Sequence, residues 1–211
     1  MKMEFFHDVL CTYCYMASPI IRRLSREFPE LEIQHRSFAL ILERSDYASD
    51  YGSEEEAKKS FIEHWKKNSD KSADRICNYE GLEASDDPLP ISVPPLMACE
   101  AARAVGGENA YWDVFDALEY AYFVNVQNIN DPNVIQDAVK STGINMAAWS
   151  KALKNPKTEK LLKDDFLAVA SYGVNIVPFI IIDGKPDDEH ATIGTGSYEE
   201  LKAFIENALS K

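Results

Sequence analysis

Two cysteines separated by two residues, Cys11 and Cys14, form the pattern in this sequence that could most directly carry out chemistry. Thiol–disulfide exchange needs one thiolate that attacks a disulfide and a second thiol that resolves the mixed disulfide. The intervening residues are Thr12 and Tyr13, and a first helical turn over them would bring the two sulfurs close enough to bond. The spacing therefore predicts a redox-active dithiol in which Cys11 attacks and Cys14 resolves.

The same pair could instead supply half of a zinc site, or it could be a chance pairing. A structural zinc site needs two further ligands at suitable spacing. The other two cysteines, Cys77 and Cys99, are isolated from one another, and the four histidines are scattered. We therefore predict no metal site. Cys77 and Cys99 are most simply small buried residues, although a second redox pair stays open.

The elements around the pair predict a strand–helix–strand opening. Residues 3–10 are typical of a short strand that ends at the cysteines, and residues 31–38 alternate as a second strand does. Between them, apolar residues recur at helical spacing from Tyr15 to Phe28, and Pro29 ends the pattern. The free N–H groups and the partial positive charge at the start of this helix favour a thiolate at the first cysteine.

The character of the chain changes after about residue 44 and changes again near its end. Helical segments follow one another without a strand, and residues 81–95, rich in Asp and Pro, predict a loop. Residues 176–182 predict a buried strand, and residues 191–193 could be its hairpin partner. The helices that we expect beyond the first are 53–67, 92–105, 108–124, 131–141, 146–153, 157–172 and 198–209.

This order of elements predicts an α/β domain built from two separated parts of the chain. The parts are residues 1–43 and 156–211, and an all-helical insertion over residues 44–155 lies between them.

Composition excludes several classes of protein. The chain has 211 residues with 22 Lys+Arg against 35 Asp+Glu, a net charge of −13, which argues against binding to nucleic acid or to an anionic membrane. A hydrophobic content of 45% is enough for a packed core. No run of apolar residues is long enough to span a membrane, and the charges at Glu4 and Asp8 leave no room for a signal peptide, so we expect a cytoplasmic protein.

The complete set of motifs resembles a known family. A strand, a C-x-x-C pair opening a helix that contains Pro19, and a late Gly-Val-x-x-Val-Pro-Phe segment resemble the thioredoxin fold. The large helical insertion after the second strand resembles the DsbA family. Asp8 ahead of Cys-Thr-Tyr-Cys-Tyr, the fragment Ala-Tyr-Phe at 121–123 and Tyr-Gly-Val at 172–174 resemble, more narrowly, its cytosolic FrnE-type branch.

The resemblance implies roles for individual residues. Pro178 would be in the cis form and pack against the disulfide, and the backbone of Val177 would pair with a substrate peptide as an added strand. Cys11 and Cys14 would cycle between dithiol and disulfide without a tightly bound cofactor. Protein or small-molecule disulfides would be the substrates, and glutathione or a thioredoxin-like protein would restore the dithiol.

Two residues depart from the pattern of the branch. Thr12 and Tyr13 stand where Pro and Trp are common, and these positions tune the redox potential in this fold. In a reducing cytosol we therefore expect reduction or isomerisation of disulfides rather than strong oxidation.

Weaker candidates surround the pair. His7 and Asp8 could shift the charge state of the first cysteine, although solvation at a strand end is the more ordinary interpretation. Related folds keep a buried acid near the resolving cysteine, and Glu4 is the candidate here, one residue out of register. Tyr13 is expected at the rim of the site and Tyr15 in the core.

Two other classes of function stay open. Kappa-class glutathione transferases and 2-hydroxychromene-2-carboxylate isomerases share the inserted thioredoxin fold, but they usually carry serine where Cys11 stands and lack the second cysteine. A non-enzymatic, holdase-like binding module would use the helical insertion and keep the cysteine pair for structure alone.

Overall fold

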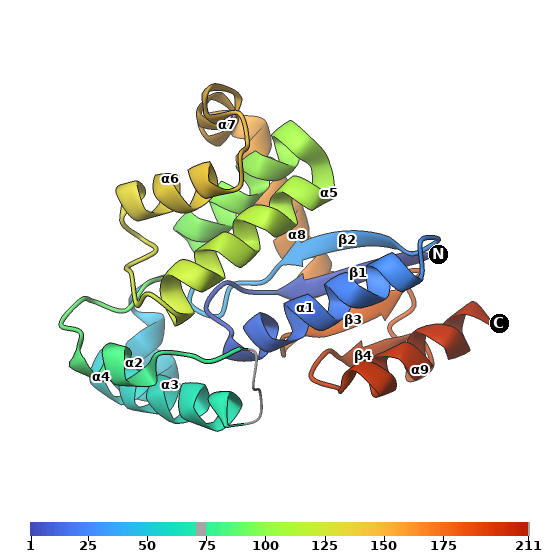
Figure 1. The fold of residues 1–211 in the computed structure, drawn as a ribbon, viewed down its shortest axis with the longest axis horizontal. Coiled ribbons are helices and arrows are strands. Elements are labelled where there is room, and N and C mark those ends of the chain that lie inside the picture. The colour runs from blue at the N-terminus through green and yellow to red at the C-terminus, as the bar shows by residue number, and fades with distance from the viewer. Residues whose placement is uncertain (71–74, 211) are drawn as a thin grey trace.

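A mixed sheet of four strands positions the cysteine pair in this computed structural model, which describes residues 1–70 and 75–210. The strand order is β2-β1-β3-β4, with β1 parallel to β2 and antiparallel to β3 (Figure 1). The strands are β1 (Lys2–His7), β2 (Glu32–Ser37), β3 (Phe179–Ile182) and β4 (Ala191–Ile193). Because β1 is central, the loop that follows it leaves the middle of the sheet directly into the C-x-x-C helix.

Helices cover both faces of this sheet and extend beyond one end of it. The described helices are α1 (Thr12–Glu27), α2 (Asp46–Tyr51), α3 (Glu54–Ser69), α4 (Tyr79–Ala84), α5 (Val93–Phe123), α6 (Pro132–Ser141), α7 (Met146–Leu153), α8 (Pro156–Tyr172) and α9 (Tyr198–Leu209). Figure 1 shows α2, α3 and α4 grouped at the end of the sheet where α1 begins. The first turn of α1 therefore lies between the sheet and the inserted helices.

The side chains of β1 alternate between the two faces of the sheet, and those on each face pack in a different buried cluster. Met3 and Phe5 pack with Ile21 of α1 and Ile205 of α9 in one buried cluster. Phe6 points the other way into a second cluster that continues through the inserted helices. This is the period-two pattern of a strand that is buried on both sides. The thioredoxin-like α/β fold with a helical insertion is thus confirmed.

The second cluster contains residues from both proposed parts of the chain. Phe6 and Cys14 belong to it together with Trp65 and Phe123 of the insertion. The division into two domains at residues 43 and 156 stays a prediction, since one core joins them.

Several predicted boundaries are wrong. Residues 8–10 form a turn rather than the end of the strand, with the Cys11 N–H donating to the Asp8 carbonyl at 3.0 Å. The late strand begins at Phe179, and Ile176 is exposed. Tyr79–Ala84 is helical although it overlaps the predicted loop, and α2 has no counterpart among the predicted helices. Short helices of this kind carry too few residues to show a period.

Other predictions about the insertion are confirmed. The two helices expected on either side of Gly107 meet there in α5, where this glycine has a φ of 72°, a conformation that L side chains rarely adopt. The aromatic residues of α5 pack in the core, except that Tyr120 is exposed. The described part of residues 44–155 contains no strand. Among the described helices, none has the length and apolar character needed to cross a bilayer.

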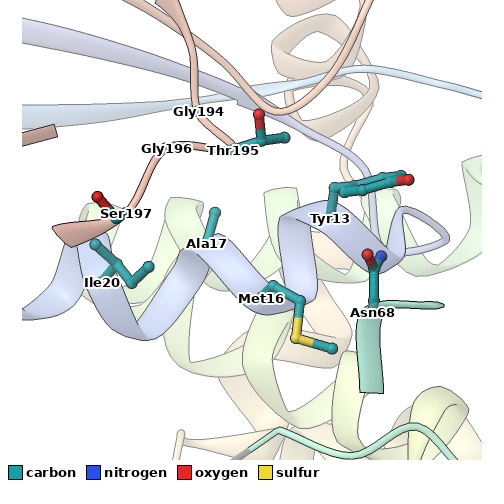
Figure 2. A pocket seen from close by; sticks show the side chains of 9 residues that line it. All are labelled: Tyr13, Met16, Ala17, Ile20, Asn68, Gly194, Thr195, Gly196 and Ser197. Carbon is teal, nitrogen blue, oxygen red and sulfur yellow. The ribbon is translucent and has the colours of Figure 1, made fainter. Parts of the chain in front are cut away.

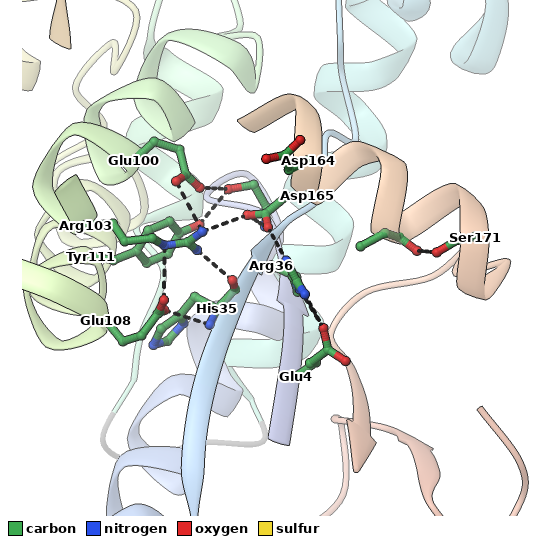
Figure 3. Close-up of polar contacts among 12 residues, drawn as sticks. Glu4, His35, Arg36, Glu100, Arg103, Glu108, Tyr111, Asp164, Asp165 and Ser171 are labelled. Atoms are coloured by element: carbon green, nitrogen blue, oxygen red, sulfur yellow. Dashed lines mark hydrogen bonds and ion pairs between the residues drawn. The ribbon is translucent and has the colours of Figure 1, made fainter. Parts of the chain in front are cut away.

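Buried charges link the sheet to the helices behind it. Arg36 of β2 pairs with Glu4 of β1 and with Asp165 of α8 at 3.0 Å, and Arg103 of α5 pairs with the same Asp165 at 3.3 Å (Figure 3). Glu100 completes the group by pairing with Arg103 at 3.2 Å. This network fixes β1, and hence the loop that carries the cysteines, against α5 and α8.

Candidate active site

Cys11 occupies the N-cap position of α1. Its backbone is extended, with φ −87° and ψ 106°, and its Sγ accepts a hydrogen bond from the Cys14 N–H at 3.3 Å. The first N–H groups of a helix have no partner within the helix, and here the cysteine sulfur takes the place that a Ser or Asp oxygen usually fills. The Cys11 sulfur therefore faces a backbone donor at the N-terminal end of the helix.

Cys14 lies one turn further into the helix and has no access to solvent. Its side chain is 0% exposed, whereas that of Cys11 is 5% exposed. Burial raises the pKa of Cys14 well above its usual value, and its hydrogen bond to Cys11 raises it further. The order of roles, in which Cys11 meets a substrate first and Cys14 acts afterwards, stays a prediction. All four cysteines are free thiols.

The Val177–Pro178 segment lies against the cysteine pair. The peptide bond between the two residues is cis, as the family resemblance implied. The Cys11 thiol donates to the Val177 carbonyl at 3.5 Å. Gly194 N–H donates to the Pro178 carbonyl at 2.8 Å, and a Cβ at Gly194 would stand 3.1 Å from the proline ring. This distance is tighter than an ordinary Cβ contact, so the close approach of this loop to the proline favours glycine.

An apolar hollow of about 430 Å³ opens beside Cys11. It runs from α3 and the loop after β2 to the segment before Pro178, and His64 also lines it. Its apolar and aromatic lining comes from Leu10, Leu40, Tyr51, Phe61, Trp65, Ile176, Val177 and Ile193. A hollow with this lining can bury apolar groups next to Cys11.

A second hollow of about 480 Å³ lies on the other side of Tyr13, between α1 and the loop before α9 (Figure 2). Met16, Ala17 and Ile20 of α1 line it, and Ala17 points toward the loop that carries Thr195. Tyr13 and Thr195 line both hollows. The two hollows therefore form adjoining parts of one surface around the first turn of α1, with Tyr13, half-buried, at the rim predicted for it.

Thr12 lines the apolar hollow, and residues of the insertion contact its side-chain oxygen. It is buried, its Oγ1 accepts from Asn68 Nδ2 at 3.2 Å, and the Cys77 sulfur lies 3.6 Å from the same oxygen. These contacts tie the C-x-x-C turn to α3 and to the segment before α4. Tyr15 is in the core, stacked on Phe123 at 4.9 Å, as predicted.

His7 is fully buried, so the interpretation that it is solvated at the strand end is wrong. Its Nε2 lies 2.9 Å from His35 Nδ1, and its ring packs edge-on against Phe115 at 4.1 Å. Burial lowers the pKa of His7 well below its usual value and keeps the ring neutral. These contacts tie His7 to β2 and α5, and a supporting role for it at the active site stays a prediction.

Asp8 is also buried, against the same expectation, and it organises the loop before the cysteines. Its carboxylate accepts from the N–H groups of Leu10 and Leu40 and from the Ser92 hydroxyl at 2.6 Å. Burial raises the pKa of Asp8 from 3.8 to about 6, although the three donors act in the opposite direction. The acid thus fastens the active-site loop to the segments before α2 and α5.

We expect Asp8 to give protein stability a measurable pH dependence. The pKa of Asp8 is higher in the folded state than in the unfolded state, so the unfolded state loses this proton first as the pH rises. The contribution of Asp8 to the free energy of unfolding therefore falls between about pH 4 and about pH 6. The full change amounts to about 3 kcal/mol, of which about 2 kcal/mol falls between pH 4 and pH 6. Urea unfolding of wild type and Asp8→Asn at both pH values measures it. A difference between the two proteins that is the same at both pH values would contradict this assignment.

The buried acid expected at Glu4 is already paired with other groups. Glu4 accepts from Arg36 at 2.7 Å and from the Tyr172 hydroxyl at 2.9 Å. The acid that sequence reasoning missed is Glu119 of α5, which is buried and whose charge raises the pKa of Cys14. No motif marks it, because it comes from a distant helix that reaches the site only when the chain folds.

The chain belongs to a known family, described as the DSBA-like thioredoxin domain, which matches residues 2–206. A curated relative, the ClpXP adapter protein SpxH of Bacillus subtilis (strain 168), is 24% identical over 199 residues, which cover 94% of this chain and 63% of the relative. The chain therefore spans less than two thirds of the length of that protein.

Solved structures show the same fold. A putative protein disulfide isomerase from Nitrosomonas europaea has a TM-score of 0.79 at 14% identity, covering 99% of this chain and 97% of that one. The cytosolic disulfide reductase DsbM from Pseudomonas aeruginosa has a TM-score of 0.75 at 17% identity, and the match covers 100% of this chain and 99% of that one. The structure of DsbM with GSH has a TM-score of 0.72, and the match covers 100% of both chains. A 2-hydroxychromene-2-carboxylate isomerase has a TM-score of 0.65 at 14% identity, covering 99% and 96%. At these identities the likeness concerns the fold alone.

Proposed function

We propose that this protein is a thiol–disulfide oxidoreductase of the protein disulfide reductase or isomerase type, with Cys11 and Cys14 as its redox pair. The observation that carries the proposal is the setting of the Cys11 sulfur. It caps α1, accepts the Cys14 N–H at 3.3 Å, lies beside the cis Val177–Pro178 bond and faces an apolar hollow. Membership of the DSBA-like family supports this function at the level of the class.

The reaction follows from these positions. The Cys11 thiolate attacks one sulfur of a substrate disulfide, forming a mixed disulfide and releasing the other substrate sulfur as a thiolate. Cys14 then loses its proton and attacks Cys11, and the second substrate sulfur leaves with the bonding electron pair. The substrate gains two electrons and the pair becomes a disulfide. A second dithiol returns the enzyme to its starting state.

We assign supporting roles to the neighbouring residues. The backbone of Val177 would hold the substrate chain in an extended form, Pro178 would pack against the pair, and Tyr13 would contact the substrate where the two hollows meet. Thr12 would hold the C-x-x-C turn through Asn68. No tightly bound cofactor or metal is required, and glutathione or a thioredoxin-like protein would supply electrons. We place the reaction in the cytoplasm and the chain in the FrnE-type branch.

A second candidate function follows from the similarity to an adapter protein. A binding module of this type would use the apolar hollow, or the inserted helices, to hold a partner polypeptide without exchanging disulfides. Replacing Cys11 by Ser would leave such binding unchanged, whereas it would abolish dithiol catalysis.

The glutathione transferase or isomerase class is a further alternative, supported by the fold shared with a 2-hydroxychromene-2-carboxylate isomerase. The complete C-x-x-C pair favours the redox function over it. Assays of peptide-disulfide reduction with glutathione as electron donor, and of glutathione conjugation to an electrophile, separate these classes. We expect turnover in the first assay and none in the second, and the reverse pattern would replace our proposal with the transferase class.

A further inference from the structure

A histidine lines the apolar hollow that opens beside Cys11. Among the described residues of this lining there is no Asp, Glu, Lys or Arg, and the titratable side chains besides His64 are Cys11, Tyr13 and Tyr51. Histidine is the side chain that ordinarily gains or loses a proton between pH 5 and 8. His64 is therefore the residue of this lining that is best suited to transfer a proton near neutral pH.

Helix α3 holds His64 beside the cysteine turn. Phe61, His64 and Asn68 follow one another at helical spacing and so share one face of α3. The side chain of Asn68 donates to Thr12 Oγ1 at 3.2 Å. The imidazole ring of His64 meets the Tyr13 ring edge-on, with the ring centroids 6.1 Å apart. Both residues between the two cysteines are thus contacted by α3, which fixes the imidazole next to the C-x-x-C turn.

The ring of His64 can exchange protons with solvent. The residue is exposed, and its ring nitrogens have no hydrogen-bond or ion-pair partner among the residues that the structure describes. The other histidines differ, because His7 and His35 contact each other in the core at 2.9 Å and His190 is held by Asp187 at 2.7 Å. A proton that His64 gives away can therefore be replaced from water.

The first step of disulfide exchange places negative charge on a substrate sulfur. The departing sulfur keeps the electron pair of the broken S–S bond, and the reaction is slower when the leaving thiol is more basic. Of the backbone groups that contact the Cys11 sulfur, the Cys14 N–H serves Cys11 itself and the Val177 carbonyl is an acceptor. Because Cys11 and His64 line the same hollow, a substrate that reacts there brings its departing sulfur into the space that the imidazole lines.

We propose that His64 donates a proton to the substrate sulfur that departs when Cys11 attacks a disulfide. This inference rests on the proposed oxidoreductase function. A bond forms between the Cys11 sulfur and one substrate sulfur, and the substrate S–S bond breaks. The second sulfur keeps the electron pair, takes the proton from the imidazolium and leaves as a thiol rather than as a thiolate. Cys11 is oxidised to the mixed disulfide, the departing sulfur is reduced, and the neutral ring regains a proton from water.

This role implies a class of substrate. Alkyl disulfides, such as those formed by cysteine, release basic thiols and gain most from a proton donor. Aromatic disulfides release thiols of low pKa, which leave as thiolates without one. We therefore expect His64 to favour alkyl disulfides over aromatic ones.

The test compares two disulfides that differ in the basicity of the leaving thiol. Bis(2-hydroxyethyl) disulfide releases an alkyl thiol and 4,4′-dipyridyl disulfide releases a thiol of low pKa, and both are uncharged at pH 7. The complete protein carries Cys14→Ser, so that only the attack by Cys11 is followed, as formation of the mixed disulfide by intact-protein mass spectrometry. His64→Ala should slow the attack on the alkyl disulfide by a factor on the order of 10² and change the attack on the dipyridyl disulfide by less than about twofold.

Further variants separate proton donation from structure. His64→Gln keeps a polar side chain but has no proton to transfer at neutral pH, so it should behave like His64→Ala. Free imidazole should restore part of the rate of His64→Ala with the alkyl disulfide. His190→Ala is the matched control, because this histidine lies before β4, binds Asp187 and does not line the hollow. It should leave both rates unchanged.

Each result decides the inference. Equal rates with and without His64, or equal slowing on both disulfides, would overturn it while leaving the oxidoreductase function in place. With His64 present, the rate should fall less steeply with the basicity of the leaving thiol than the rate of a small free thiol does. An equally steep fall would also overturn the inference, even if the His64 variants do not fold. If Cys11 forms a mixed disulfide with neither probe, the proposed function fails together with the inference.

Discussion

Cys11→Ser reduces the rate of peptide-disulfide reduction to that of the uncatalysed reaction. The oxygen of serine is a far weaker nucleophile than a thiolate, and it cannot form the mixed disulfide on which the second step depends. Cys14→Ser has a different outcome, since Cys11 still attacks but cannot be released. This variant should accumulate a covalent complex with the substrate, visible by non-reducing electrophoresis and intact-protein mass spectrometry.

Cys99→Ala is the matched control for both variants. Cys99 is a cysteine of α5 that is fully buried in the same core cluster as the active pair. We expect this variant to keep the wild-type rate of disulfide reduction. Reduction that persists in Cys11→Ser would show that another group carries the reaction and would contradict the role assigned to Cys11. A wild-type protein that reduces no disulfide would instead favour the adapter class.

The second large effect concerns stability. Arg103→Ala should lower the free energy of unfolding by about 3–5 kcal/mol, as is typical when one partner of a buried ion pair is removed. Arg103 is 10% exposed and contacts Glu100, Glu108 and Asp165 at 3.2–3.3 Å, and it also donates to the His35 carbonyl at 2.6 Å (Figure 3). Without the guanidinium, the buried charge of Asp165 keeps less compensation.

Urea unfolding at neutral pH measures this loss. Lys59→Ala serves as the control, because Lys59 is 57% exposed and pairs with Glu55 and Glu56 on the surface of α3. Such a surface pair contributes at most about 1 kcal/mol. A loss below about 1 kcal/mol for Arg103→Ala would mean that the buried network does not hold the sheet against α5 and α8.

The cysteine pair could be predicted from the sequence because its two residues lie close together in the chain. Cys11 and Cys14 lie on one helical turn, and the strand before them and the helix after them follow from short-range periodicity. Val177 and Pro178 could be connected to the cysteines only through the family resemblance, because the contact between them joins the first and last thirds of the chain.

The buried polar surroundings of the cysteine turn could not be predicted in the same way. Glu119 looks like an ordinary polar position within an aromatic helix, and its approach to the cysteine turn depends on how α1 packs against α5. The solvation predicted for His7 and Asp8 is wrong for a related reason. Polar residues at the end of a strand are usually solvated, but here the inserted helices cover them.

A redox titration of the Cys11–Cys14 pair tests the central claim most directly. The protein is equilibrated across glutathione ratios, free thiols are trapped by alkylation, and the four cysteines are counted by peptide mass spectrometry. We predict one reversible two-electron transition confined to Cys11 and Cys14, with a potential nearer to about −270 mV, typical of a reductase, than to about −120 mV, typical of a strong oxidant. A pair that never forms a disulfide, or a Cys11 that stays bound to glutathione, would contradict the dithiol mechanism.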